Sequence, residues 1–250
     1  MPSRESAVRI VVLAHDLLGT YGDLGNGVVL EARLRWRGLP SELVVHEGGE
    51  PAPAEADIYL LGGGEDAPQS LAFDELAATD GLPRAVASGA VVLGVCAGFQ
   101  LLGRQFATSD GRTLPGFGLL DVKTGPGGSL PRAVGEIAVE PDAALGLPTL
   151  TGFENHAGRT RLGRDAKPFG RVIEGVGNTG TDGIEGAYRG HVVGTYLHGP
   201  VLVRNPALAD LLLSWVIGPL DPLSEPAVET LRRERLAAVT TPGRRRFARR

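Results

Sequence analysis

The single cysteine of the chain lies in a Gly-x-Cys-x-Gly frame, the segment Gly94-Val95-Cys96-Ala97-Gly98. An apolar run, Val91–Val95, precedes it as an expected strand, and Phe99–Phe106 follows it as an expected helix. Such a frame at a strand-to-helix turn is typical of a nucleophile elbow, here with sulfur in place of a serine oxygen. We expect the helix start to favour the thiolate form of Cys96. The alternative is an inert buried cysteine, but the two glycines favour a nucleophile.

A reactive thiol needs a general base, and the position of His198 makes it the preferred candidate among five histidines. His198 follows the apolar run Val192–Tyr196 and precedes Gly199-Pro200, so it is expected at a strand end, as Cys96 is. His156 lies in an expected loop after Glu154 and Asn155 and is the rival candidate.

An acyl-transfer site also needs backbone N–H groups for the oxyanion. Ala97, directly after the cysteine, supplies one, and Gly63 in the Gly62-Gly63-Gly64 loop is the candidate for the second, because glycine lets the backbone come close. The competing interpretation is a phosphate-binding loop. No Gly-Lys-Ser/Thr follows, and Glu65-Asp66 would repel phosphate. The glycine loop is therefore interpreted as part of the thiol site.

The elements that must position these residues alternate between strand and helix in the first half of the chain. Expected strands are Val8–Leu13, Glu42–Val45, Ile58–Leu61 and Val91–Val95, and expected helices are Asn26–Arg37, Pro68–Ala78, Leu82–Ser88 and Phe99–Phe106. This alternation predicts an α/β fold with a doubly wound, mostly parallel sheet flanked by helices. Ligands of such sheets bind beyond the carboxyl ends of the strands, where the glycine loop and Cys96 both fall.

The second half is expected to hold shorter strands and one confident helix, Pro206–Ile217. The strands are expected over Leu119–Lys123, Val134–Val139, Arg171–Glu174, Ala187–Arg189 and Val192–Tyr196. No repeat or linker interrupts the chain, so we predict a single domain over residues 1–220, followed by a C-terminal helix and an arginine-rich tail over residues 221–250.

Composition excludes several classes of protein. The chain has 250 residues, 42% of them hydrophobic, and a net charge of −4. One cysteine excludes an internal disulfide, and no apolar run is long enough to cross a membrane, so a cytoplasmic protein is expected. Residues 231–250 carry a net charge of +7, which leaves −11 on the rest and argues against nucleic-acid binding. The tail is interpreted as solvated, with an arm for an acidic partner as the alternative. One Cys and five scattered His predict no metal site.

Three segments together resemble class I glutamine amidotransferases: Gly94–Gln100, the glycine loop, and Thr195-Tyr196-Leu197-His198-Gly199. The last resembles the cobyric acid synthase-like branch. Three more segments are similar to the GatD-type glutaminase subunits of lipid II isoglutaminyl synthase: Tyr21–Asn26, Gly152–Thr160 and Gly175–Asn178. The resemblance runs from about Val8 to about Ile217.

The resemblance implies a reaction and a role for each site residue. Cys96 would attack the side-chain amide of L-glutamine and release ammonia, and the glutamyl thioester would be hydrolysed to glutamate. His198 would protonate the ammonia and activate the water. Gln100, one helical turn after Cys96, would help to hold the glutamine. Arg132 matches the substrate-binding arginine of the family, whose planar fork suits a carboxylate.

The resemblance also implies a partner. Ammonia would pass to a MurT-like, Mur-ligase-family synthetase in a heterodimer, which would bind ATP and magnesium and amidate the D-glutamate of the peptidoglycan stem peptide. This chain would need no cofactor. Many class I members carry Glu two residues after the catalytic His, where this chain has Pro200. A carboxylate from the partner is the implied substitute.

Two alternatives remain. The chain could serve a corrinoid or other biosynthetic synthetase, although such proteins usually carry the synthetase domain fused to the glutaminase. It could also be a non-catalytic binding module that keeps the fold. The joint presence of Cys96, His198, Gln100 and the glycine loop argues against the second alternative.

Overall fold

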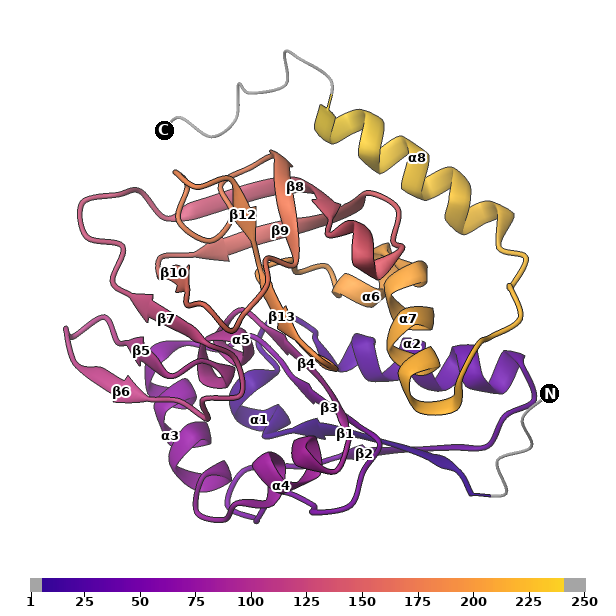
Figure 1. Cartoon of the computed structure of the whole chain (residues 1–250), viewed down its shortest axis with the longest axis horizontal. Coiled ribbons are helices and arrows are strands. Elements are labelled where there is room, and N and C mark those ends of the chain that lie inside the picture. The colour runs from indigo at the N-terminus through magenta and orange to yellow at the C-terminus, as the bar shows by residue number, and fades with distance from the viewer. Residues whose placement is uncertain (1–5, 241–250) are drawn as a thin grey trace.

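A computed structural model describes residues 6–240, and a six-stranded sheet forms its centre (Figure 1). The strand order is β13-β14-β4-β3-β1-β2, and all neighbours are parallel except β13 and β14. The bounds are β1 Val8–Leu13, β2 Ser41–Val45, β3 Ile58–Leu61, β4 Val91–Val95, β13 Ala187–Arg189 and β14 Val192–Thr195. The predicted doubly wound, mostly parallel sheet is confirmed.

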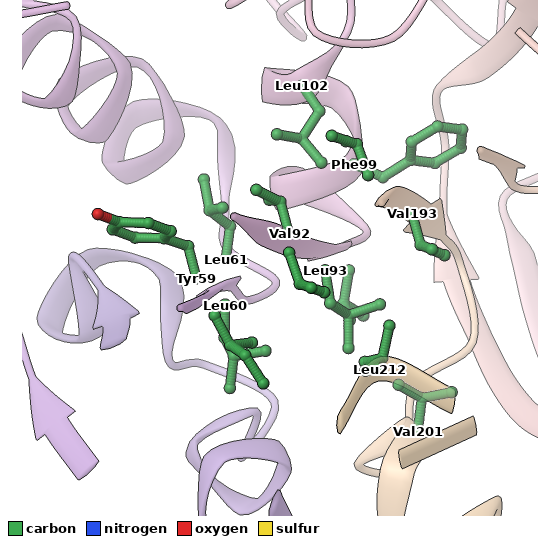
Figure 2. Close-up of a cluster of buried hydrophobic side chains, with 14 of the residues drawn as sticks. Tyr59, Leu60, Leu61, Val92, Leu93, Phe99, Leu102, Val193, Val201 and Leu212 are labelled. Carbon is green, nitrogen blue, oxygen red and sulfur yellow. The ribbon is translucent and has the colours of Figure 1, made fainter. Parts of the chain in front are cut away.

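Helices cover both faces of this sheet because its central strands are apolar on both sides. One face carries α2 (Leu24–Trp36), α6 (Val201–Arg204) and α7 (Pro206–Ile217), which contact one another. The other carries α1 (His15–Leu18), α3 (Asp66–Leu76) and α5 (Ala97–Leu102), and α4 (Gly81–Ala87) follows α3. Figure 2 shows Phe99 and Leu102 of α5 on one side of β3, β4 and β14, with Leu212 and Val201 on the other. These fully buried side chains fix the strand ends that carry the site.

The second half forms two four-stranded sheets beside the central one. The first has the order β10-β7-β5-β6, and its strands are β5 Gln105–Ala107, β6 Thr113–Pro115, β7 Val122–Gly125 and β10 Arg159–Leu162. The second is antiparallel with the order β12-β11-β8-β9, and its strands are β8 Ala133–Pro141, β9 Leu150–His156, β11 Gly170–Glu174 and β12 Ile184–Glu185. A 3-10 turn, Ala143–Leu145, connects β8 to β9.

Two sequence predictions about these elements are wrong. The helix expected over Phe99–Phe106 ends at Leu102, because Gln105–Ala107 pairs with β6 and β7 instead. His156, expected in a loop, ends strand β9 and lies opposite Ala133 of β8. Both errors involve strands that are fixed by pairing with other strands, β5 with β6 and β7, and β9 with β8, and such pairing overrides local pattern.

The C-terminal helix α8 (Pro226–Thr240) lies along the outside of the antiparallel sheet, where it contacts β8, β9 and β11 (Figure 1). Its approach is fixed by an ion cluster in which the buried Arg33 guanidinium binds Asp210 at 2.7 Å and Glu225 at 2.8 Å. The predicted arginine-rich tail from residue 241 lies outside the described residues. Within residues 6–240, no helix is both long enough and apolar enough to cross a membrane.

Candidate active site

Cys96 occupies a sharp turn between β4 and α5, as the glycine frame predicts. Its backbone has φ 52° and ψ −102°, a conformation that is costly for a residue with a Cβ and is found at nucleophile elbows. A Cβ at Gly98 would lie 2.4 Å from the Leu61 carbonyl oxygen, so only glycine lets α5 approach β3 this closely. The Gly98 N–H donates to the Gly62 carbonyl at 3.0 Å. The elbow and the glycine loop are therefore joined directly.

The Cys96 thiol is buried, and the structure corrects the expectation of a thiolate at rest. Burial, reinforced by the charge of Asp23, raises the pKa of Cys96 to about 12. The Ala97 N–H and the positive charge of Arg132 act in the opposite direction but do not prevail. The six-residue helix α5 is outweighed by desolvation of the sulfur. The thiol is therefore protonated at neutral pH until a base removes its proton.

The strands that lead to Cys96 and to His198 are neighbours, so the two residues lie at the same edge of the central sheet. Thr195 of β14 pairs with Val95 of β4, and the Cys96 N–H donates to the Thr195 carbonyl at 2.9 Å. The backbone of His198 exchanges two hydrogen bonds with Phe153 of β9, at 2.9 and 3.0 Å. Burial, together with the charges of His156 and Arg132, lowers the pKa of His198 to about 4. The imidazole is therefore neutral at physiological pH and able to accept a proton.

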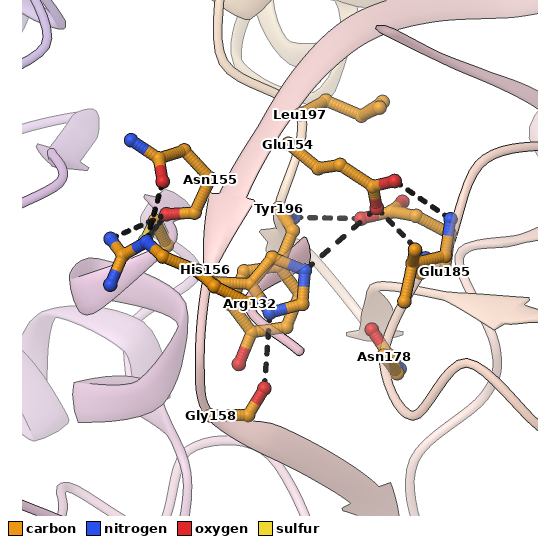
Figure 3. A network of polar contacts seen from close by, with 12 residues as sticks. Arg132, Glu154, Asn155, His156, Gly158, Asn178, Glu185, Tyr196 and Leu197 are labelled. Carbon is orange, nitrogen blue, oxygen red and sulfur yellow. Dashed lines mark hydrogen bonds and ion pairs between the residues drawn. The ribbon is translucent and has the colours of Figure 1, made fainter. Parts of the chain in front are cut away.

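The rival base, His156, is engaged elsewhere. Its ring stacks on Tyr196, with ring centroids 3.7 Å apart, and its Nδ1 lies 3.0 Å from the Gly158 carbonyl. Its Nε2 lies 3.9 Å from a carboxylate oxygen of Glu154 (Figure 3). These contacts hold His156 in a buried polar cluster and favour His198 as the base.

The glycine loop is close to His198, but the Gly63 N–H points at a carboxylate. It donates to Asp23 Oδ2 at 2.7 Å. A Cβ at Gly63 would lie 2.8 Å from the Cε1 of His198, and one at Gly62 would lie 2.9 Å from the Cβ of Asp23. Glycine is therefore needed at both positions to admit these side chains. The Gly63 N–H expected for the oxyanion is occupied in this structure, so the oxyanion role of Gly63 and Ala97 stays a prediction.

Tyr21 and Asp23, which precede α2, also lie in the site. The sequence did not predict a role for either residue. Asp23 is 3% exposed, and its Oδ2 lies 4.0 Å from Nδ1 of His198. The Tyr21 ring packs on the His198 ring at a centroid distance of 4.7 Å. The Tyr21–Asn26 segment is part of the family resemblance, which is the one signal that could have drawn attention to both.

Arg132 joins the site through Asn155. The guanidinium donates from Nε to Asn155 Oδ1 at 2.6 Å and from Nη2 to the Asn155 carbonyl at 3.2 Å (Figure 3). The same carbonyl oxygen lies 4.0 Å from the sulfur of Cys96. Arg132 is exposed, so its remaining N–H groups can reach a ligand carboxylate beside the thiol.

Gln100 lies on α5 one turn after the cysteine, with its amide held by two other side chains. Its Oε1 accepts from Gln69 Nε2 at 3.0 Å, and its Nε2 donates to the Tyr196 hydroxyl at 3.2 Å. The Tyr196 hydroxyl is also bonded to Thr160 at 2.6 Å. This network fixes the orientation of Gln100, and one N–H of its amide remains for a ligand.

A buried acidic cluster supports the strand end that carries His198 (Figure 3). Glu185 is fully buried and accepts from the Thr195 hydroxyl at 2.8 Å and from the Tyr196 N–H at 2.7 Å. Glu154 accepts from the N–H groups of Val176 and Gly177 at 2.7 and 2.9 Å. Burial raises the pKa of Glu185 to about 7, and the charge of Glu154 adds to the effect.

The raised pKa of Glu185 predicts a pH-dependent stability. The folded state holds the Glu185 proton more tightly than the unfolded state, so its contribution is fully present below pH 4.5 and is lost as pH rises towards 7. The shift corresponds to roughly 3 kcal/mol at most. We expect Glu185→Gln to flatten the pH dependence of the free energy of unfolding, measured by urea denaturation. Glu140→Gln, on the exposed side of β8, should leave it unchanged.

Within residues 6–240, no group of three or more His, Cys, Asp or Glu side chains is arranged to hold a metal ion. The glycine loop is followed by Glu65 and Asp66, as noted above, which disfavours a bound phosphate. The site combines a thiol, a neutral imidazole and an exposed arginine. That combination is suited to nucleophilic attack on an amide or ester that carries a carboxylate.

Comparisons with known proteins agree with this chemistry. Residues 9–206 match the CobB/CobQ-like glutamine amidotransferase domain. The chain is 38% identical over 200 residues to the lipid II isoglutaminyl synthase (glutamine-hydrolyzing) subunit GatD of Staphylococcus aureus, covering 79% of each chain. It is 34% identical to the same subunit of Streptococcus pneumoniae, covering 83% of this chain and 79% of that one.

More distant similarities extend to longer proteins and to solved structures. A cobyric acid synthase of Pelotomaculum thermopropionicum is 34% identical over 85% of this chain, which spans 40% of that enzyme. A solved glutamine amidotransferase superposes with a TM-score of 0.57 at 20% identity, covering 83% of this chain and 98% of that one. The last similarity supports the α/β fold.

Proposed function

Because the chain belongs to the CobB/CobQ-like glutamine amidotransferase family, we propose that it is the glutaminase subunit of a lipid II isoglutaminyl synthase. The single observation that carries the reaction is the placement of Cys96 at the elbow after β4, with a neutral, buried His198 shortly after the end of the neighbouring strand β14. The similarity to two GatD subunits over about four fifths of both chains supports the identity of the complex.

The first half of the reaction forms a thioester. Glutamine binds with its α-carboxylate on Arg132 and its side-chain amide above Cys96. His198 takes the thiol proton as the sulfur attacks the amide carbon, which avoids a free thiolate in this buried site. The Ala97 N–H stabilises the oxyanion, and the Gly63 N–H can add a second donor only when it leaves Asp23 Oδ2. His198 then gives the proton to the departing nitrogen as the C–N bond breaks, and ammonia leaves.

The second half regenerates the thiol. A water molecule gives a proton to His198 as its oxygen attacks the thioester carbon. The C–S bond breaks, the proton returns to the sulfur, and glutamate leaves. Gln100, held by Gln69 and Tyr196, helps to position the amino acid through both steps.

Ammonia is consumed by a second subunit. We propose a MurT-like synthetase of the Mur-ligase family that binds ATP and magnesium and amidates the D-glutamate of the stem peptide to D-isoglutamine. The two subunits would form a heterodimer in the cytoplasm. Residues 241–250 contain five arginines, whereas the rest of the chain carries a net negative charge, so an acidic surface of the partner would attract them.

The test is reconstitution with the synthetase subunit. The full chain and a MurT-like protein are incubated with lipid II, ATP, magnesium and glutamine, and the stem peptide is analysed by mass spectrometry. When both subunits are present, we expect amidation with either glutamine or a high concentration of ammonium salt as the nitrogen source. When this chain is omitted, we expect amidation with ammonium salt but not with glutamine. Glutamine-dependent amidation of a corrinoid by a different synthetase, with none of lipid II, would contradict the proposal.

A further inference from the structure

We propose that Asp23 is the positioning residue for His198 in the glutaminase reaction, so that the carboxylate of the site comes from the loop before α2 of this chain. The proposal rests on the proposed function. It replaces the expectation that the partner must supply the carboxylate missing at Pro200.

The first observation is that the buried His198 ring, which lacks hydrogen-bond partners within the described part of the chain, faces the carboxylate of Asp23. Asp23 Oδ2 lies 4.0 Å from His198 Nδ1, and the two side chains are 3% and 5% exposed. Neither ring nitrogen of His198 has a hydrogen-bond partner among the described residues. Buried polar atoms in folded proteins are nearly always hydrogen-bonded. A movement of about 1 Å would bring the carboxylate into hydrogen-bond range of Nδ1.

The second observation is that the surroundings hold Asp23 in this place. The Gly63 N–H donates to Oδ2 at 2.7 Å, and the Asn26 amide donates to Oδ1 at 3.4 Å. Asn26 also accepts the Leu202 N–H at 3.0 Å and so ties the loop to the segment after His198. A carboxylate oxygen can accept a second hydrogen bond, so Asp23 can contact His198 without losing the hydrogen bond from the Gly63 N–H.

The third observation concerns the position where relatives with a full triad carry glutamate. Pro200 stands there, and a Cβ at Gly25 would lie 2.6 Å from its Cγ. The start of α2, directly after Asp23, therefore packs against Pro200, and Gly25 makes that approach possible. The carboxylate reaches His198 from the loop that covers this position instead of from the position itself.

The chemistry follows from which nitrogen the carboxylate faces. Asp23 opposite Nδ1 keeps a proton on Nδ1 and leaves Nε2 free to take the thiol proton of Cys96 as the C–S bond forms. The imidazolium that results is stabilised by the negative charge, and its Nε2 proton passes to the departing ammonia. Burial raises the pKa of Asp23 to about 6, so the carboxylate is ionised at neutral pH and takes up a proton at more acidic pH. Other charged or titratable groups face this pair: His15 and Cys96 interact with the charge of Asp23, His156 and Arg132 act on His198, and the Tyr21 ring packs on the His198 ring.

The alternative role for Asp23 is purely structural, as an acceptor for the glycine loop. Asp23→Asn separates the two roles, because the asparagine oxygen can still accept the Gly63 N–H while the negative charge is lost. Asp23→Glu restores the charge on a longer side chain and is the matched rescue variant.

The experiment compares the unaltered full-length chain, Asp23→Asn and Asp23→Glu, each in complex with the synthetase. For Asp23→Asn we expect kcat for glutamine hydrolysis to fall roughly 10²- to 10⁴-fold with little change in KM, and Asp23→Glu to regain part of the loss. The acid limb of the pH profile should move to lower pH in Asp23→Asn, because the imidazolium loses its counter-charge. In ¹⁵N spectra of the ring nitrogens, with His198 assigned through His198→Gln, the Nδ1–H form should dominate only in the chains that keep the carboxylate.

A kcat of Asp23→Asn within about three-fold of the starting protein, with the same pH profile and the same His198 tautomer, would overturn the proposal. Labelling of Cys96 by a glutamine-like electrophile, with protection by glutamine, is measured in parallel. If the unaltered chain is labelled and Asp23→Asn is fully active, Asp23 is structural and the proposed function stands. If the unaltered chain is neither labelled nor active with the synthetase, the proposed function itself fails.

Discussion

Replacing Cys96 by alanine is expected to abolish glutamine hydrolysis and glutamine-dependent amidation. No other cysteine exists in the chain, so no second thiol can take over the attack. The fold should be retained, because alanine is smaller than cysteine and an Sγ contact of 4.0 Å to Asn155 is the one polar contact of the sulfur with another segment. Release of glutamate from glutamine is the direct measurement.

The control for Cys96→Ala uses the partner reaction. Ammonium salt bypasses the glutaminase, so the variant complex should amidate lipid II with ammonium as well as the unaltered complex does. A loss of both activities would point to a disturbed complex rather than to missing chemistry. Retained hydrolysis of glutamine by purified Cys96→Ala would show that the assignment of the nucleophile is wrong.

Replacing His198 by glutamine is expected to lower kcat for glutamine hydrolysis roughly 10²- to 10⁴-fold. The thiol has its pKa raised to about 12 by burial and therefore depends on a base, and the neutral imidazole that follows the neighbouring strand can accept the proton. In the unaltered chain, hydrolysis should fall as pH drops towards the pKa of His198 near 4, because a protonated ring cannot act as the base. Steady-state kinetics across pH measure both effects.

His156→Gln is the matched control for His198→Gln. Both histidines are buried, but His156 is stacked on Tyr196 and paired with Glu154 in the polar cluster. We expect its replacement to lower thermal stability and to change kcat much less than His198→Gln does. A larger loss of kcat in His156→Gln than in His198→Gln would show that His156 is the general base and that His198 is structural.

Local pattern was sufficient where an element and its function lie in one short segment. The glycine frame around Cys96 predicted the elbow. Only glycine permits the approach of α5 to β3, and glycines at these positions can be recognised in the sequence. The strand runs predicted the central sheet, since an apolar run between turn residues has few other stable forms. His198 was preferred over His156 because the ends of neighbouring parallel strands meet at one edge of a sheet.

Local pattern failed where contacts between separate segments decide the structure. The helix expected over Phe99–Phe106 lost its last turn to pairing with β6 and β7. The thiolate expected from the helix start is not favoured, because burial raises the pKa of Cys96 and the extent of burial depends on the packing of the whole site. Arg132 was placed by family resemblance alone, and its link to Cys96 through Asn155 depends on the pairing of β8 with β9.

The sequence by itself determined the class of fold and predicted a nucleophile and a base, because these depend on residue type, glycine spacing and periodicity. The tertiary structure alone decided which carboxylate faces the base. Asp23 is separated from His198 by most of the chain, and the two meet because the bare backbone of Gly62 and Gly63 leaves room for both. Such a meeting is fixed by packing across the sheet, which no local pattern encodes.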